Sequence, residues 1–176
     1  MKRRWPVAGL LIVAVVAAAW YFVVRDEAVA PGVAFPEATS TLGSGEEAIA
    51  VTPDGLVLDW LPLPAKAELP ELPPVEAPKG GRLAGPMLEQ ARVLGAAPPA
   101  LRPYLARSYY GDSGVDVELT TGIELRFGDD TQVAKKWKAA AAVLADPSIE
   151  ALDYVDLLAP ARPTIGGSGH TLPPPP

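Results

Sequence analysis

The chain has 176 residues, a net charge of −6 and no cysteine, with 21 prolines and 16 glycines. The acidic balance gives no electrostatic basis for binding nucleic acid or an anionic lipid surface, and the lack of cysteine excludes disulfides and thiolate metal sites. This length allows one domain with extensions. Without disulfides or thiolate metal sites, that domain must be stabilised by packing alone.

The N-terminus combines a short basic segment with a long apolar one. Residues 1–6 carry three positive side chains, and residues 7–24 contain no charge over 18 positions. An apolar helix of that length spans about 27 Å, close to the hydrocarbon thickness of a bilayer. We therefore expect a cytoplasmic tail (1–6) and a transmembrane helix (7–24), with the rest outside the cytoplasm. A cleaved signal peptide is the alternative, but this apolar segment is longer than signal peptides usually have.

The segment after this helix lacks a regular pattern. Residues 25–46 contain many small and helix-breaking residues, so we expect a flexible linker. Apolar segments then flank the Thr-Pro-Asp-Gly sequence at 52–55, which predicts a hairpin because proline presets the first turn dihedral and glycine accepts a positive φ. The prolines of 61–81 favour an extended connector. Gly85-Pro86 and Gly95 suit the start and the end of a first helix.

The strongest local signal is the alternation of apolar and charged residues over 115–127. Opposed residues of an antiparallel pair share a face, so pairing Leu119 with Ile123 keeps the apolar side chains of both strands together. The three-residue loop between them ends in Gly122, where a left-handed conformation is needed. A two-residue loop would place every apolar side chain opposite a charge. We therefore predict a second hairpin with this register.

An amphipathic helix is predicted after this hairpin. Asp129 or Asp130 can cap it, and Trp137 recurs with smaller apolar residues on one face, which we expect to be buried. Lys136 and its two neighbouring lysines are expected on the solvent side. The last segment with a folding signal, 151–165, begins with residues that are apolar on both faces and stop at a proline, which predicts one more strand.

The order of these elements predicts the fold class. Hairpin, connector, helix, hairpin, helix and strand favour an α+β fold: a mainly antiparallel β-sheet with two helices packed on it. A single transmembrane helix and a flexible linker are expected to precede it. The folded domain is expected over 47–165, and a disordered Gly/Pro tail over 166–176.

No residue pattern predicts catalysis. The sole histidine, His170, lies in the Gly/Pro tail, where nothing is expected to orient it, and the serines lack a nucleophile motif. Asp112, Asp116 and the Asp129-Asp130 pair supply carboxylates, but helix capping and solvated turns explain them better than a catalytic or cation site. We therefore expect no catalytic residue, no cofactor and no metal ion.

Several of these segments, in this order, resemble the end of the FtsQ/DivIB family of bacterial cell-division proteins. The similarity covers residues 47–165. It rests on the strand from Gly122 to Gly128, the lysine-bearing helix, the Val155-Asp156-Leu157 strand and the Pro160-x-Arg162-Pro163 ending. A single anchor with a short basic cytoplasmic end also agrees with this family.

The resemblance implies a non-catalytic, single-pass scaffold of the bacterial divisome. It would lie in the cell inner membrane at the division septum, with its C-terminal domain outside the cytoplasm. Family members bind the small coiled-coil proteins FtsB and FtsL through the C-terminal edge strand of the β domain. The corresponding partner-binding residues expected here are Tyr154, Val155, Asp156, Leu157 and Leu158. An internal strand with both neighbours in place is the alternative.

Two features depart from the family pattern, and two other functions stay open. Residues 25–46 leave no room for the POTRA module that family members carry before the β domain, and Leu158 stands where the family has arginine. The other functions are a membrane-anchored envelope hydrolase with a carboxylate pair and a generic envelope or secretion adaptor. The hydrolase would bring an Asp/Glu pair together in a pocket, whereas the adaptor would be distributed uniformly in the membrane.

Overall fold

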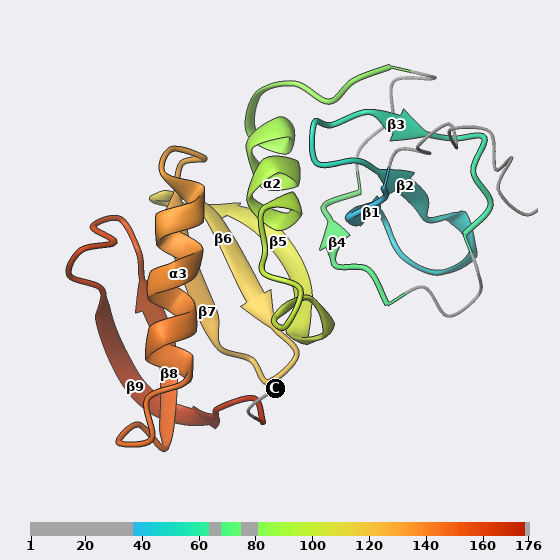
Figure 1. Ribbon diagram of the computed structural model, residues 1–176. Coiled ribbons are helices and arrows are strands. Elements are labelled where there is room, and N and C mark those ends of the chain that lie inside the picture. The colour runs from blue at the N-terminus through green and yellow to red at the C-terminus, as the bar shows by residue number, and fades with distance from the viewer. Residues whose placement is uncertain (1–36, 64–67, 75–80, 175–176) are drawn as a thin grey trace, which may run out of the picture. The chain divides into compact units, whose positions relative to one another are not determined.

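The structure, a computed structural model, describes residues 37–63, 68–74 and 81–174. Within these residues it contains one nine-stranded sheet and two α-helices (Figure 1). The strands are β1 (Ser40–Leu42), β2 (Ile49–Val51), β3 (Val57–Leu58), β4 (Glu71–Leu72), β5 (Leu105–Gly111), β6 (Gly114–Leu119), β7 (Glu124–Gly128), β8 (Ala151–Asp156) and β9 (Thr164–Thr171). The helices are α2 (Gly85–Gly95) and α3 (Val133–Leu144), with short 3-10 helices η1 (Gly45–Glu47) and η2 (Arg102–Tyr104).

The sheet is mixed but mostly antiparallel. Its spatial order is β3-β2-β1-β4-β5-β6-β7-β8-β9, and only the β1–β4, β4–β5 and β7–β8 pairs are parallel. A mostly β sheet with two helices confirms the predicted α+β class for the described part of the chain.

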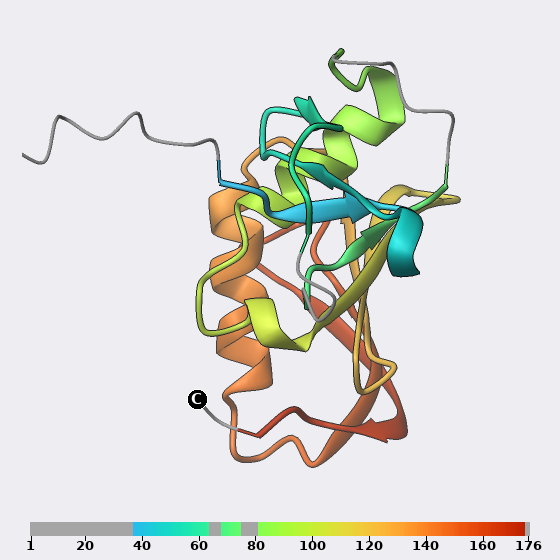
Figure 2. The same cartoon turned by 90° about the vertical axis from the view of Figure 1, so that its right-hand side faces the viewer.

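Both helices pack on one face of the sheet (Figure 2). α2 contacts β5 and β6, and α3 contacts β7. Trp137 of α3 is buried, as predicted, and its ring lies 4.7 Å from the ring of Phe127 on β7. The Trp137 indole N–H also donates to the Val93 carbonyl of α2 at 2.8 Å. One side chain therefore joins both helices to the sheet.

The two predicted hairpins are confirmed. β2 and β3 flank a turn in which Gly55 has a positive φ of 77°. In the β6–β7 hairpin the Leu119 N–H donates to the Ile123 carbonyl at 2.8 Å, which is the predicted pairing. Gly122 is left-handed there, with φ 92°. The predicted first helix is also present, as α2.

The start of α3 differs from the prediction. Neither Asp129 nor Asp130 caps the helix, because its N-cap is Gln132 in a left-handed conformation with φ 50°. Lys136, predicted on the solvent side, is only 3% exposed, since its ammonium donates to the Phe127 carbonyl at 2.7 Å and to the Asp129 carboxylate at 2.6 Å. The hydrogen bond from Lys136 lowers the pKa of Asp129 to about 2.

The ordered domain extends further at both ends than the predicted 47–165. β1 lies in the segment predicted to be a flexible linker, and most of β9 lies in the predicted disordered tail (166–176). β1 has only three residues and pairs with β2, the next strand along the chain, and with the more distant β4, so its order comes from pairing on both sides. A strand of three residues is too short to show a regular alternation of apolar and polar residues in the sequence.

The predicted terminal strand is present as β8, but the prediction that it forms an open edge is wrong. β7 pairs with one side of β8 in parallel, and β9 pairs with the other side in antiparallel orientation. The alternative of an internal strand therefore holds.

The predicted cytoplasmic tail (1–6), the predicted transmembrane helix (7–24) and the first part of the predicted linker lie outside the described residues. None of the helices within the described ranges combines the length and the apolar character needed to cross a bilayer.

Candidate functional site

β9 is the terminal strand of the sheet and pairs, among the described residues, only with β8 (Figure 1). The opposite end of the sheet is covered, because the Val57 N–H of β3 donates to the Gly81 carbonyl at 3.0 Å. The β9 sequence contains no proline, lysine or acidic residue, although natural proteins often protect an open edge with such residues. An uncharged open edge can accept a strand from another chain.

Side chains of β8 explain why the glycine-rich sequence of β9 forms a strand. The Tyr154 ring covers Gly166, where an added Cβ would lie 2.6 Å from the Tyr154 hydroxyl oxygen. The Asp153 carboxylate accepts the Gly169 N–H at 2.7 Å. These contacts take the place of the side-chain packing that β9 itself lacks, because aromatic residues can cover edge glycines in sheets.

His170 belongs to β9 rather than to a disordered tail. Its ring lies against the β6–β7 turn, where an added Cβ on Gly122 would lie 2.6 Å from it. This contact attaches the far end of β9 to the neighbouring hairpin, which gives His170 a structural role. Within the described ranges, no three His, Asp or Glu side chains are arranged to hold a metal ion.

The five predicted partner-binding residues differ in accessibility. Val155 and Leu157 are completely buried and belong to the hydrophobic core, so a partner cannot contact them in the folded domain. Asp156 is half-buried, and its carboxylate accepts the Leu158 N–H at 2.9 Å. Leu158 itself is 51% exposed. Tyr154 is partly exposed, and the Arg126 guanidinium lies 4.1 Å from its ring centre.

Two exposed apolar side chains lie on or beside the last two strands of the sheet. Ile165 of β9 is 45% exposed and pairs in register with Val155, and Leu158 follows β8. Leu158 also lines a groove of about 630 Å³ between α3 and the connection from β8 to β9. The groove residues are Gln132, Lys135, Lys138, Ala139, Ala142, Leu158, Ala159, Pro160 and Ala161. A mostly apolar floor with two lysines suits an apolar segment that carries acidic residues.

The sheet face opposite the helices carries a polar network. Tyr109 donates its hydroxyl to Glu124 at 2.8 Å, and Arg126 forms an ion pair with the same carboxylate. Asp116 is in register with both Tyr109 and Arg126, yet no donor among the described residues reaches its buried Oδ1 atom. Burial, with help from the charge of Glu124, raises the pKa of Asp116 to about 6.

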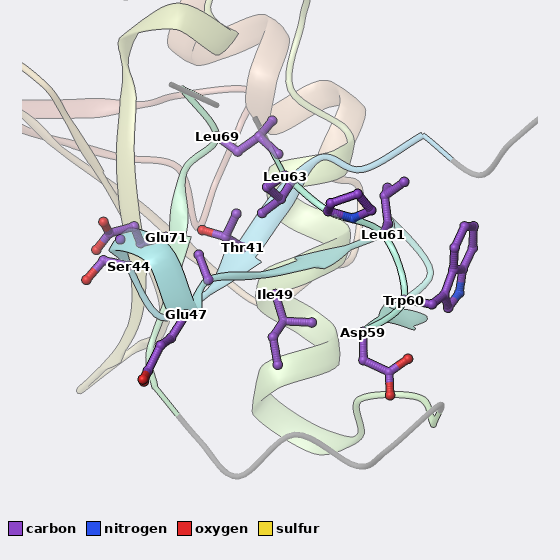
Figure 3. Close-up of a pocket in the computed structure, with 13 residues that line it drawn as sticks. Thr41, Ser44, Glu47, Ile49, Asp59, Trp60, Leu61, Leu63, Leu69 and Glu71 are labelled. Atoms are coloured by element: carbon purple, nitrogen blue, oxygen red, sulfur yellow. The ribbon is translucent and has the colours of Figure 1, made fainter. Parts of the chain in front are cut away.

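Another hollow of about 910 Å³ lies beside β1 and β2, with the exposed Trp60 at its rim (Figure 3). Its lining includes the carboxylates of Glu47, Asp59 and Glu71. Figure 3 shows Glu47 and Glu71 at one side of the hollow and Asp59 at the other, and no two of these carboxylates point toward each other. The hollow therefore gives no support to a hydrolase with a converging carboxylate pair.

β9 is the element of the candidate site that sequence reasoning missed. One signal was available: Thr164 to Leu172 is free of proline in a chain with 21 prolines, and it is bounded by Pro163 and Pro173. The three glycines of the strand weaken that signal, because glycine has a low intrinsic preference for strands. The side chains of β8 and the contact of His170 with the β6–β7 turn show why the segment is ordered.

Comparison with protein-family models matches residues 45–157 to the description "Cell division protein FtsQ/DivIB, C-terminal". The matched range covers more than half of the chain and ends before β9. A comparison with curated proteins found no significant match.

Proposed function

Because the chain belongs to the FtsQ/DivIB family of cell-division proteins, we propose that it is a scaffold that binds other division proteins through β9. Proteins of this family are non-enzymatic and associated with the membrane. The observation that supports this role best is the open, uncharged edge of β9. The partner surface expected on β8 therefore moves one strand outward, to β9.

Strand addition supplies the binding energy in this proposal. The outward backbone groups of β9 pair with an extended segment of the partner, and side chains on either face of the sheet give specificity. On the helix side, partner residues contact Ile165 on β9 and, farther along, Leu158 where it lines the groove beside α3; both side chains are about half exposed. On the other side they meet the Tyr154 ring, because Gly166 has no side chain to cover it. Two of the five predicted residues thus keep a direct role.

The groove beside α3 extends this surface. A partner chain that continues from the β9 edge past the β8–β9 connection reaches the groove, where Lys135 and Lys138 lie beside Leu158, alanines and Pro160. Lysine attracts acidic side chains at a partly desolvated surface. In this proposal the two lysines of α3 supply the positive charge that family members have at the position of Leu158. The partners are small division proteins of the FtsB and FtsL type.

The proposed position in the cell follows from the N-terminal sequence. Residues 7–24 anchor the chain in the inner membrane, the basic residues before them stay in the cytoplasm, and the β domain acts outside the cytoplasm.

Charge substitution at the edge tests this function. Ile165→Glu and Leu158→Glu place a carboxylate on the proposed contact surface at positions that are already exposed, so the domain stays folded. We expect each to reduce co-purification with the FtsB-type protein of the same genome at least about tenfold. Trp60→Glu is the matched control, because Trp60 is an exposed apolar residue (58%) beside β3, at the other end of the strand order.

Circular dichroism checks that all three variants keep their secondary structure. Undiminished capture by both edge variants would refute binding at β9. Equal loss with Trp60→Glu would show that the effect is not specific to this edge.

A further inference from the structure

The pairing between β8 and β9 is interrupted in the middle. Leu152 pairs with His170 and Tyr154 pairs with Gly166, so the segment 167–169 lies opposite Asp153 alone. Such a bulge leaves residues unpaired, bends the strand and increases its twist. The open edge of β9 is therefore not one continuous eight-residue template.

The Asp153 carboxylate occupies the inside of this bulge. Its Oδ1 accepts the Gly169 N–H at 2.7 Å. A Cβ on Gly169 would lie 2.5 Å from that oxygen, and a Cβ on Gly167 would overlap the same carboxylate. Gly167 also has φ 79°, a left-handed conformation that L-residues with side chains rarely adopt. The two glycines and the aspartate therefore fit one another as a unit.

We propose that Asp153 is a positioning residue that holds this bulge and so confines strand addition to Thr164–Gly166. The inference rests on the proposed function of β9 and adds the register of the partner strand to it. Thr164 to Gly166 continue the regular ladder with β8, pairing with Asp156, Val155 and Tyr154. Beyond Gly166 the bulge turns the backbone away from that ladder, which ends the pairing with the added strand. Bulges at sheet edges commonly end pairing in this way.

A first experiment tests the positioning role without any partner. Amide hydrogen exchange is measured by NMR on the full chain in detergent micelles. Asp153→Ala is expected to speed exchange at the Gly169 amide about tenfold, as loss of a hydrogen bond to a charged group implies. Asp153→Asn keeps an oxygen acceptor and should stay within about twofold of the parent chain. Asp112→Ala, which removes the same charge from the exposed β5–β6 turn, is the control.

A second experiment maps the register. The chain has no cysteine, so an introduced one reports alone. Ile165→Cys should form a disulfide with one or two neighbouring positions in a cysteine scan of the extracytoplasmic segment of the FtsB-type protein. Ser168→Cys, in the bulge, should form none. In the Asp153→Ala background the crosslinks of Ile165→Cys should spread over more positions, and those of Ser168→Cys should appear.

The outcomes separate the two proposals. Equal crosslinking of Ile165→Cys and Ser168→Cys in the parent chain would overturn the register restriction while supporting binding at β9. Crosslinks at neither position would overturn both the binding at β9 and the register that depends on it. An unchanged Gly169 exchange rate in Asp153→Ala would overturn the positioning role itself. Asp153→Asn should restore both the slow exchange at Gly169 and the narrow crosslinking pattern. A general loss of stability in Asp153→Ala would not predict this restoration.

Discussion

Asp116 is 6% exposed on β6, in register with Arg126, but that guanidinium pairs with Glu124 and covers the Tyr154 ring. The charge of Asp116 is therefore poorly compensated. Burial is the largest cause that raises its pKa. The negative charges of Glu124, Asp112 and Asp156 raise it further, and the positive charge of Arg126 lowers it. Its folded pKa of about 6 lies above the ordinary value of 3.8. The folded chain thus binds this proton more tightly than the unfolded chain.

This shift predicts a pH dependence of stability. The contribution of Asp116 to the free energy of unfolding should fall as the pH rises from 3.8 through about 6, and stay low above that. Asp116→Asn should raise the free energy of unfolding at pH 7.5 by about 1–3 kcal/mol and change it little at pH 4. Thermal unfolding followed by circular dichroism between these pH values measures the effect. Glu118→Gln on the same strand face, which loses the Arg107 ion pair, should give no such gain.

Lys136 gives a second prediction for a single residue. Its buried ammonium joins α3 to the end of β7 through the Phe127 carbonyl and the Asp129 carboxylate. Lys136→Met leaves that carbonyl without its donor and should lower the free energy of unfolding by about 1–3 kcal/mol. Lys138→Met, an exposed position on the same helix, should change it by less than about 0.5 kcal/mol. Urea unfolding compares the two, and equal effects would contradict the anchoring role of Lys136.

At the scale of elements, β9 is held by contacts with neighbouring segments of the chain. One of these contacts joins His170 to the β6–β7 turn at Gly122. A sequence pattern predicts that turn, because the alternation of residues 115–127 sets its register locally. The same pattern cannot predict that a strand ending nearly fifty residues later packs its histidine there.

Two glycine substitutions measure this contact. Gly122→Ala and Gly43→Ala both place a side chain in a left-handed conformation, which costs about 1–2 kcal/mol. Gly43 has open space around it, whereas a Cβ on Gly122 meets the His170 ring. We therefore expect Gly122→Ala to be the more destabilising in thermal unfolding. The excess should disappear when His170→Ala is present in both backgrounds, and its persistence would show that His170 does not pack on the turn.

At the scale of the whole molecule, the family assignment predicts where the chain acts. A fusion of a fluorescent protein to the N-terminus should form a band at midcell in dividing cells. The Ile165→Glu and Leu158→Glu variants should show whether this placement depends on β9. Fluorescence microscopy of living cells measures the ratio of midcell to lateral signal. A uniform membrane signal from the parent fusion would favour the generic envelope adaptor over a division protein.

Local chemistry along the chain was sufficient to predict the hairpin turns, the limits of α2 and the burial of Trp137. Each of these depends on residues within a turn or two of each other, where hydrophobic period and glycine placement act directly. The tertiary structure alone decided that β8 is internal, that Lys136 is buried and that β9 is the open edge. Those outcomes depend on contacts such as Tyr154 on Gly166 and Asp153 on Gly169. The spacing of hydrophobic residues in the sequence does not reveal such contacts, because their energy arises only when distant segments meet across the sheet.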